Sequence, residues 1–165
     1  MKPEALMQRL KSTKAYLDQS TSDLTEQNSS FRPTEDSLTV AQQFAHVALV
    51  IDWFVEGGFG DGFGENDYAK MPTFDDALEN IKSLAGARSL CAQSFSNAIR
   101  VVGSKTPQQV SELMPENSIM GAAPRMNIVH AIEDHTVHHC GVLNVYSRMC
   151  GIAPPMSHLE TEVAV

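Results

Sequence analysis

The stretch that decides the fold is Asn127–Gly151, NIVHAIEDHTVHHCGVLNVYSRMCG, which places four of the six histidines of the chain within ten residues. Its apolar residues recur at helical intervals, so the pattern predicts one long amphipathic helix. Gly151, followed by Pro154 and Pro155, is expected to end the helix, because glycine favours the backbone conformation that closes a helix and proline cannot continue one. The apolar side of this helix should therefore face the interior of the protein.

Two of these histidines, His135 and His139, are four residues apart and lie on the same face of the predicted helix. That face is otherwise apolar and is shared with Ile128, Ile132, Val142, Leu143 and Tyr146. Inward imidazoles at this spacing are typical of helical metal sites, although the absence of an HExxH motif excludes the zincin class. A third ligand would have to be an inward histidine on a different helix, and the sequence offers one at His46.

Three further helices are predicted from apolar periodicity and capping residues. The first runs from about residue 3 to about residue 27. The second begins at a cap provided by Ser37 or Thr39 and carries His46 in its middle, and the third runs without a break from Thr73 to Gly103. No segment alternates apolar and polar residues with period two, so the sequence predicts an all-α fold, a four-helix bundle.

The connections are also informative. The segment 57–72 holds five glycines and is predicted to be a long crossover that is neither helix nor strand. It follows a helix rather than a strand, which argues against a nucleotide-binding glycine loop. A second connection, 105–124, is expected to carry one short helical turn near 108–113. We assign residues 1–155 to one bundle domain and residues 156–165 to a flexible C-terminal tail.

Composition excludes several function classes. Twelve Lys and Arg against twenty Asp and Glu give a net charge of −8, and no basic cluster is present, so nucleic acid is not an expected partner. Three cysteines without CxxC spacing indicate neither a disulfide framework nor a cysteine zinc site, and they suit a reducing cytoplasm. The N-terminus has no apolar signal region, and the longest apolar run, 45–51, is interrupted by His46, so we expect a soluble protein that does not enter a membrane.

Two segments resemble those of a known family, the DinB/YfiT-like metalloenzymes, and the resemblance extends over nearly the whole chain. QQFAHVALVIDWF places His46 in the middle of the second helix, ahead of an aromatic pair. DHTVHHCGVLNVYSRMCGIAPP is similar to the last helix of the family, where HxxHHRGQ is followed by an arginine and Gly-x-x-Pro. The chain departs from that pattern at Cys140 and Val142, which stand where arginine and glutamine are common.

This resemblance implies an up-down-down-up four-helix bundle that binds Zn²⁺ or Ni²⁺ and frequently forms homodimers. It carries the metal ligands over to His46, His135 and His139. Three neutral imidazoles would also accept Fe²⁺ or Mn²⁺, so the sequence leaves the identity of the metal open. We expect a homodimer rather than a larger closed ring.

Other polar residues near the motif are predicted to lie outside the metal site. His138 is rotated about 100° from His139 around the helix, which places it on a flank or at an interface, with a ligand role in place of one of the trio as the alternative. Glu133 and Asp134 are expected to be solvated, although a carboxylate there could orient a ligand histidine. His130 and His158 are predicted at the surface.

The cysteines are not expected to be catalytic. Cys140 follows His139 directly and should face away from the metal, whereas Cys91 and Cys150 are interpreted as small core residues. No catalytic side chain is therefore assigned from the sequence.

Two function classes remain open. An open site of three neutral ligands leaves the +2 charge of an ion uncompensated, which favours binding of water or an anionic thiolate. Characterised relatives in the family imply an S-transferase that joins a low-molecular-weight thiol to a small electrophile. From the sequence itself we expect Trp53 and Phe54 to form walls of the substrate site, and the glycine-rich segment 57–64 to close over it. The alternative is a non-catalytic, stress-associated protein in which the metal is structural.

Overall fold

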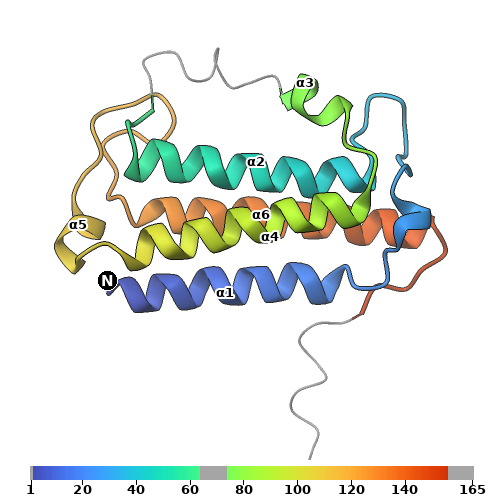
Figure 1. The fold of residues 1–165 in the computed structure, drawn as a ribbon, viewed down its shortest axis with the longest axis horizontal. Helices are drawn as coiled ribbons and strands as arrows, with labels where there is room; N and C mark the ends of the chain where they lie inside the picture. The colour runs from blue at the N-terminus through green and yellow to red at the C-terminus, as the bar shows by residue number, and fades with distance from the viewer. Residues whose placement is uncertain (1, 64–73, 156–165) are drawn as a thin grey trace, which may run out of the picture.

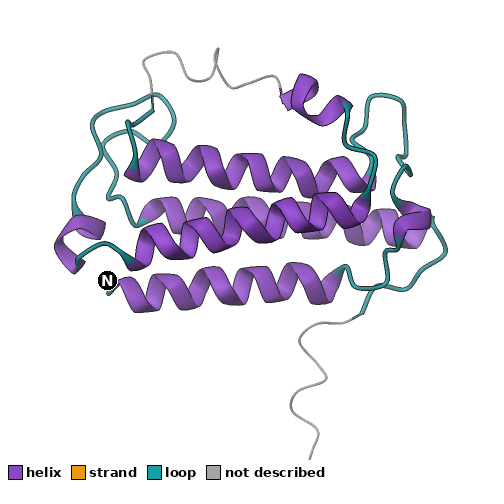
Figure 2. Ribbon diagram, viewed as in Figure 1, coloured by secondary structure: helices purple, strands orange, loops and turns teal. Residues whose placement is uncertain are grey.

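A computed structural model describes residues 2–63 and 74–155 of the chain (Figure 1). The elements are α1 (Pro3–Ser20), the 3-10 helix η1 (Glu26–Asn28), α2 (Val40–Phe59), α3 (Phe74–Glu79), α4 (Leu84–Gly103), α5 (Pro107–Ser111) and α6 (Asn127–Met149). Within the described residues the only β-type pairing is an isolated bridge between Leu113 and Pro124. Figure 2 accordingly shows helices and loops alone, and the predicted all-α class is confirmed.

Four long helices form the bundle. The colour gradient in Figure 1 shows α1 and α6 running in one direction and α2 and α4 in the other, which confirms the up-down-down-up order. Each long helix packs against two others: α2 and α1 both contact α4, and both also contact α6. α2 and α4 are therefore parallel neighbours.

The core is formed by the apolar stripes of all four helices. Its largest fully buried side chains are Phe44, Phe95, Leu6, Leu10, Leu17, Ile51, Ile128, Ile132, Leu143, Val40, Val47 and Val102. Burial of this apolar surface provides the main driving force for folding. No helix of the described part is long and apolar enough to cross a bilayer.

The second helix begins at Thr39, one of the two predicted caps. The Thr39 hydroxyl accepts from the backbone N–H of Gln42 at 3.2 Å, and the Gln42 side chain accepts from the N–H of Thr39 at 2.9 Å. This reciprocal capping box satisfies two helix donors that would otherwise lack partners.

The prediction that irregular structure begins at Gly57 is wrong, because α2 continues to Phe59 and buries both Gly57 and Gly58. A Cβ atom at Gly58 would lie 2.2 Å from Ile128 Cγ1. The glycine therefore permits α6 to approach α2 closely, and this approach outweighs the low helix propensity of glycine. Arg125 donates to the carbonyl of Gly58 and links the start of α6 to the same end of α2.

The prediction of one unbroken third helix, from Thr73 to Gly103, is also wrong. The helix is divided into α3 and α4 by residues 80–83. The Ser83 hydroxyl accepts from Gly86 N–H at 3.1 Å, and the Glu26 carboxylate accepts from Leu84 N–H and Ala85 N–H, each at 3.0 Å. These acceptors cap a new helix start and so favour the break.

The first helix ends at Ser20 rather than near residue 27. The Thr21 hydroxyl donates to the Leu17 carbonyl at 2.6 Å, and the Arg88 guanidinium donates to the Thr21 carbonyl at 2.6 Å. Arg88 also lies 4.4 Å from the centroid of the Phe44 ring. The chain is therefore held in a turn where periodicity alone predicted two more helical turns.

The predicted short turn and the last predicted helix agree with the structure more closely. α5 occupies the place of the expected short turn, with Thr106 as its cap and Pro107 at its first position. α6 ends at Met149, and Gly151 has a φ of +78°, as expected for a glycine that closes a helix. The tail, 156–165, which includes His158, lies outside the described residues.

Candidate metal centre

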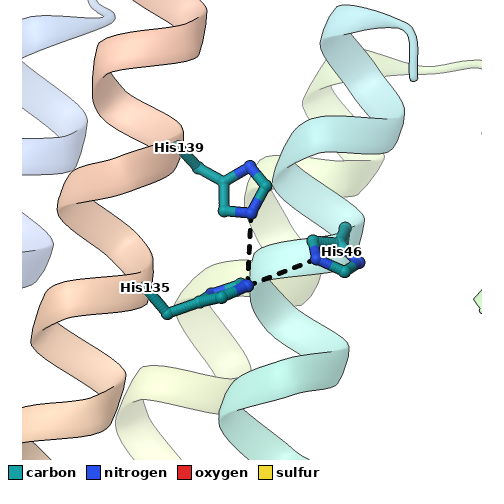
Figure 3. Close-up of side chains that lie close together, drawn as sticks. All are labelled: His46, His135 and His139. Carbon is teal, nitrogen blue, oxygen red and sulfur yellow. Dashed lines mark hydrogen bonds between the residues drawn. The ribbon is translucent and has the colours of Figure 1, made fainter. Parts of the chain in front are cut away.

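The structure brings the three predicted histidines together. His46 projects from α2, and His135 and His139 project from successive turns of α6 toward it (Figure 3). Four of the five apolar residues of the predicted stripe on α6, Ile128, Ile132, Leu143 and Tyr146, are buried, whereas Val142 is only half-buried. The site therefore lies between two antiparallel helices that pack directly against each other.

One ring nitrogen from each histidine lies within 4.8 Å of the other two. His135 Nε2 lies 3.2 Å from His46 Nε2 and 3.2 Å from His139 Nε2. Two nitrogens that bind one Zn²⁺ tetrahedrally at 2.0–2.1 Å stand about 3.3 Å apart, so these separations fit a shared ion. Across residues 2–63 and 74–155, the trio is the one group of His, Cys, Asp or Glu residues that could hold a metal in this way.

Burial keeps the three rings neutral. It lowers the pKa of His139 to about 3 and that of His135 to about 4, with further lowering from the neighbouring histidines. Burial also lowers the pKa of His46. At neutral pH each ring therefore has a nitrogen lone pair, which is the form that binds a metal ion.

One ligand is held by an outer hydrogen bond. His139 Nδ1 lies 2.5 Å from Gln43 Oε1, and Gln43 Nε2 donates to the Tyr146 hydroxyl at 3.4 Å. An amide oxygen can only accept, so His139 Nδ1 carries the hydrogen and its Nε2 keeps the lone pair. Sequence reasoning missed Gln43, although its position one turn before His46 on an apolar helix was a usable signal.

Other titratable residues of α6 surround the trio without joining it. His138 is exposed, as its predicted flank position requires, and its ring stands at 90° to that of His139 with centroids 5.0 Å apart. Glu133 does not orient a ligand in this structure. It pairs with Arg9 of α1 at 2.5 Å, while Asp134 is exposed and His130 is half-buried.

The thiols are poorly placed for nucleophilic chemistry. Cys140 is fully buried, and burial is the main cause that raises the pKa of its thiol to about 11. Burial likewise raises the pKa of the Cys91 thiol to about 12. Neither has appreciable thiolate at neutral pH. Cys91 is a core residue as predicted, whereas Cys150 is only partly buried at the end of α6.

An aromatic cluster lies further along α2. The Trp53 ring packs against the Phe54 and Phe63 rings with centroids 5.0 Å away in both cases. All three side chains are half-buried. The prediction that segment 57–64 closes over the site is partly wrong, because Gly57 and Gly58 are buried helical residues. Residue 64 lies outside the described part of the chain.

The sequence profile of the mycothiol-S-transferase family matches residues 5–146, which is most of the chain. The chain belongs to the mycothiol-S-transferase family. A crystal structure of a DinB-like protein from Bacillus cereus ATCC 10987 is similar to it, with a TM-score of 0.66 and 17% sequence identity. The alignment covers 92% of this chain and 95% of that chain. No curated protein matches the chain.

The two comparisons bear on different features, the first on the three histidines and the second on the fold. The mycothiol-S-transferase match covers all three of them, and the structural similarity confirms the DinB-like bundle. At 17% identity the crystal structure establishes the fold alone.

Proposed function

We propose that this member of the mycothiol-S-transferase family is a metal-dependent enzyme that joins a low-molecular-weight thiol to a small electrophile. The observation that carries the proposal is the grouping of three neutral imidazole nitrogens in a site to which no carboxylate or thiolate of residues 2–63 and 74–155 contributes a ligand. His46, His135 and His139 would hold the ion. A divalent metal in this position would lower the pKa of a bound thiol and stabilise its thiolate.

The ligand set favours an external thiol. Because all three side chains are neutral, they leave the charge of a divalent ion available to an anionic partner. The buried thiols of the chain do not compete, since burial raises the pKa of both Cys91 and Cys140. In the transfer, the thiol loses its proton to solvent and its sulfur forms a bond to the electrophilic carbon. The bond from that carbon to its leaving group breaks, and the group, such as the chloride of monochlorobimane, departs with the bonding electrons. We therefore propose that the nucleophile comes from the cosubstrate.

We further propose that Trp53 contributes an apolar wall for the electrophile. It lies seven residues after His46 on α2, which is close to the same face of the helix. Half-burial within an aromatic cluster keeps its ring fixed while leaving part of it accessible. Apolar walls of this kind bind small electrophiles and limit water.

Zn²⁺ and Ni²⁺ are the metals that we propose for the site. Fe²⁺ and Mn²⁺ are alternatives, because the availability of each metal in the cell influences which one is bound. The apolar core extends through all four long helices, so the fold should persist when the ion is removed. Unfolding on chelation would instead support the structural-metal alternative.

The test is a conjugation assay on metal-loaded protein with mycothiol, glutathione or bacillithiol and a panel of small electrophiles such as monochlorobimane. We expect conjugation to require the metal and to fall to the uncatalysed rate in a His46→Ala, His139→Ala double variant. His130→Ala provides a matched control, because His130 lies on α6 outside the trio. A parent rate equal to that of the double variant would contradict the proposal.

A further inference from the structure

Gln43 is a polar side chain buried in an apolar part of α2. Only 6% of its surface is exposed, and its neighbours Phe44 and Val47 are core residues. A buried amide without hydrogen-bond partners destabilises a protein, so such groups are retained when they are paired. Gln43 has a partner at each end of its amide, His139 at the oxygen and Tyr146 at the nitrogen.

The contact at the amide oxygen selects one form of His139. A neutral imidazole carries its hydrogen on either nitrogen, and the hydrogen bond made by one nitrogen decides the state of the other. With Gln43 Oε1 at 2.5 Å, the hydrogen is on Nδ1. The lone pair is then on Nε2, which faces His135 Nε2 at 3.2 Å.

The contact at the amide nitrogen holds Gln43 itself. Tyr146 is 6% exposed, and its hydroxyl accepts from Gln43 Nε2 at 3.4 Å. The Tyr146 ring is packed edge-on by Phe31, with centroids 5.7 Å apart and an interplanar angle of 78°. A flip of the amide would turn its NH₂ group toward His139 and would require the other tautomer.

The two histidines of α6 differ in this respect. His135 Nδ1 is buried and has no hydrogen-bond partner among the described residues, whereas His139 Nδ1 is bonded to Gln43. Partners of this kind fix ring orientation and increase the basicity of a metal-binding histidine. Of the two α6 histidines, His139 is therefore the one whose ring is held in the orientation needed to bind a metal ion.

We propose that Gln43 is a positioning residue that fixes His139 in the Nδ1–H form, with Tyr146 holding the amide, so that Nε2 is presented to a metal ion. The inference rests on the metal site of the proposed function and adds to it a residue that never touches the ion. Its two consequences, one for the metal-free protein and one for metal affinity, can be measured without an enzyme assay.

The first test is the tautomer of His139 in the metal-free protein, measured by long-range ¹H–¹⁵N NMR. We expect the Nδ1–H form in the parent and a shift toward the Nε2–H form in Gln43→Leu. Circular dichroism confirms that the variant is folded, and Gln43→Glu, which keeps an acceptor oxygen, should retain the Nδ1–H form. An Nε2–H form in the parent, or no change in Gln43→Leu, overturns the proposal.

The second test is Zn²⁺ or Co²⁺ affinity, measured by competition with a chelator. Loss of an outer hydrogen bond to a ligand histidine weakens metal binding by about 10–100-fold, and we expect this range for Gln43→Leu. Gln43→Glu should restore most of the affinity, and Tyr146→Phe should lose less than Gln43→Leu. Ser94→Ala is the matched control, because Ser94 is a buried polar residue of α4 bonded to Asp52 at 2.7 Å.

The outcomes separate this inference from the function on which it rests. A parent that binds one ion, with Gln43→Leu binding it equally well, overturns the role of Gln43 alone. A parent that binds no ion overturns the metal site and this inference together. Equal losses of metal affinity in Gln43→Leu and Ser94→Ala would show that removing any buried polar side chain weakens metal binding. This result would also overturn the inference.

Discussion

Two antiparallel helix pairs in this bundle have the same architecture and different interiors. Where α1 packs against α4, the buried residues are mainly apolar, including Leu6, Leu10, Phe95 and Ala98. Where α2 packs against α6, the buried or half-buried residues include His46, Gln43, His135, His139 and Tyr146. The first pair gains stability from apolar burial, and the second places polar groups where burial is costly unless they are paired or bind an ion.

The difference shows how stability and chemistry are divided between the two pairs. A four-helix bundle can hold a polar site between two of its helices when the rest of the core supplies enough apolar burial. The α1–α4 pair should therefore determine global stability. The α2–α6 pair should determine metal binding and the response to pH.

Leu10→Ala should have the largest effect on stability. Leu10 is fully buried, so the substitution is expected to destabilise the protein by about 2–5 kcal/mol in chemical denaturation. Leu113→Ala, at a site 63% exposed, is the control and should change stability by less than about 0.5 kcal/mol. The metal content of the folded Leu10→Ala protein should equal that of the parent. A loss of metal in this variant would contradict the view that the α1–α4 pair determines stability while the α2–α6 pair determines metal binding.

Acid should destabilise the metal-free protein through the histidine pair. The folded pKa values of His135 and His139, about 4 and about 3, lie below the unfolded value near 6.5. As pH falls below 6.5, the unfolded chain takes up protons that the folded chain does not, so stability is lost. The free energy of unfolding should be lower at pH 5 than at pH 7 by roughly 2–4 kcal/mol, because each unit of pKa difference corresponds to about 1.36 kcal/mol.

The contribution of the pair is isolated by repeating these measurements on a His135→Leu, His139→Leu variant. Its stability should depend much less on pH over the same interval. Identical pH profiles for the parent and this variant would mean that other groups cause the acid effect.

His135→Leu alone should stabilise the metal-free protein by roughly 0.5–2 kcal/mol, because it removes a buried polar ring whose Nδ1 has no partner among the described residues. Denaturation in the presence of a chelator measures this gain. Added Zn²⁺ should then stabilise the parent but not the variant. If the variant is less stable than the parent without metal, the contacts within the trio stabilise the fold by themselves.

The smallest effect is expected at the surface, where Arg9 of α1 pairs with Glu133 of α6. The two side chains are 44% and 29% exposed, so Glu133→Gln should cost less than about 1 kcal/mol, and less again at high salt. Asp134→Asn, at an exposed neighbour, is the control. A cost above that of Leu10→Ala would contradict the view that apolar burial dominates.

Parts of the fold and site that depend on local spacing could be predicted from the sequence. The inward face of α6 follows from apolar residues three and four positions apart, and this spacing also places His135 and His139 together. The start of α2 could be narrowed to a cap at Ser37 or Thr39, and the structure selects Thr39, which forms a capping box with Gln42. His46 could be named as the partner because it is the inward histidine on another helix.

Features that depend on distant contacts could not be predicted. The division of α3 from α4 is favoured by the Glu26 carboxylate, which is remote in sequence from the helix start that it caps. Gly58 is helical because Ile128 of α6 packs against it. The position of Gln43 on an apolar helix was a usable signal, but its partner could not be named, because His139 meets the amide only when α6 packs against α2. In each case a tertiary contact outweighed the local pattern.

Metal stoichiometry tests the central claim most directly. The protein should be purified without an immobilised-metal resin, stripped with a chelator and titrated with Zn²⁺, with elemental analysis of the dialysed product. We predict one ion per chain in the parent and none retained in a folded His46→Ala, His135→Ala, His139→Ala variant. A full equivalent of metal on that variant, or none on the parent, would contradict the account.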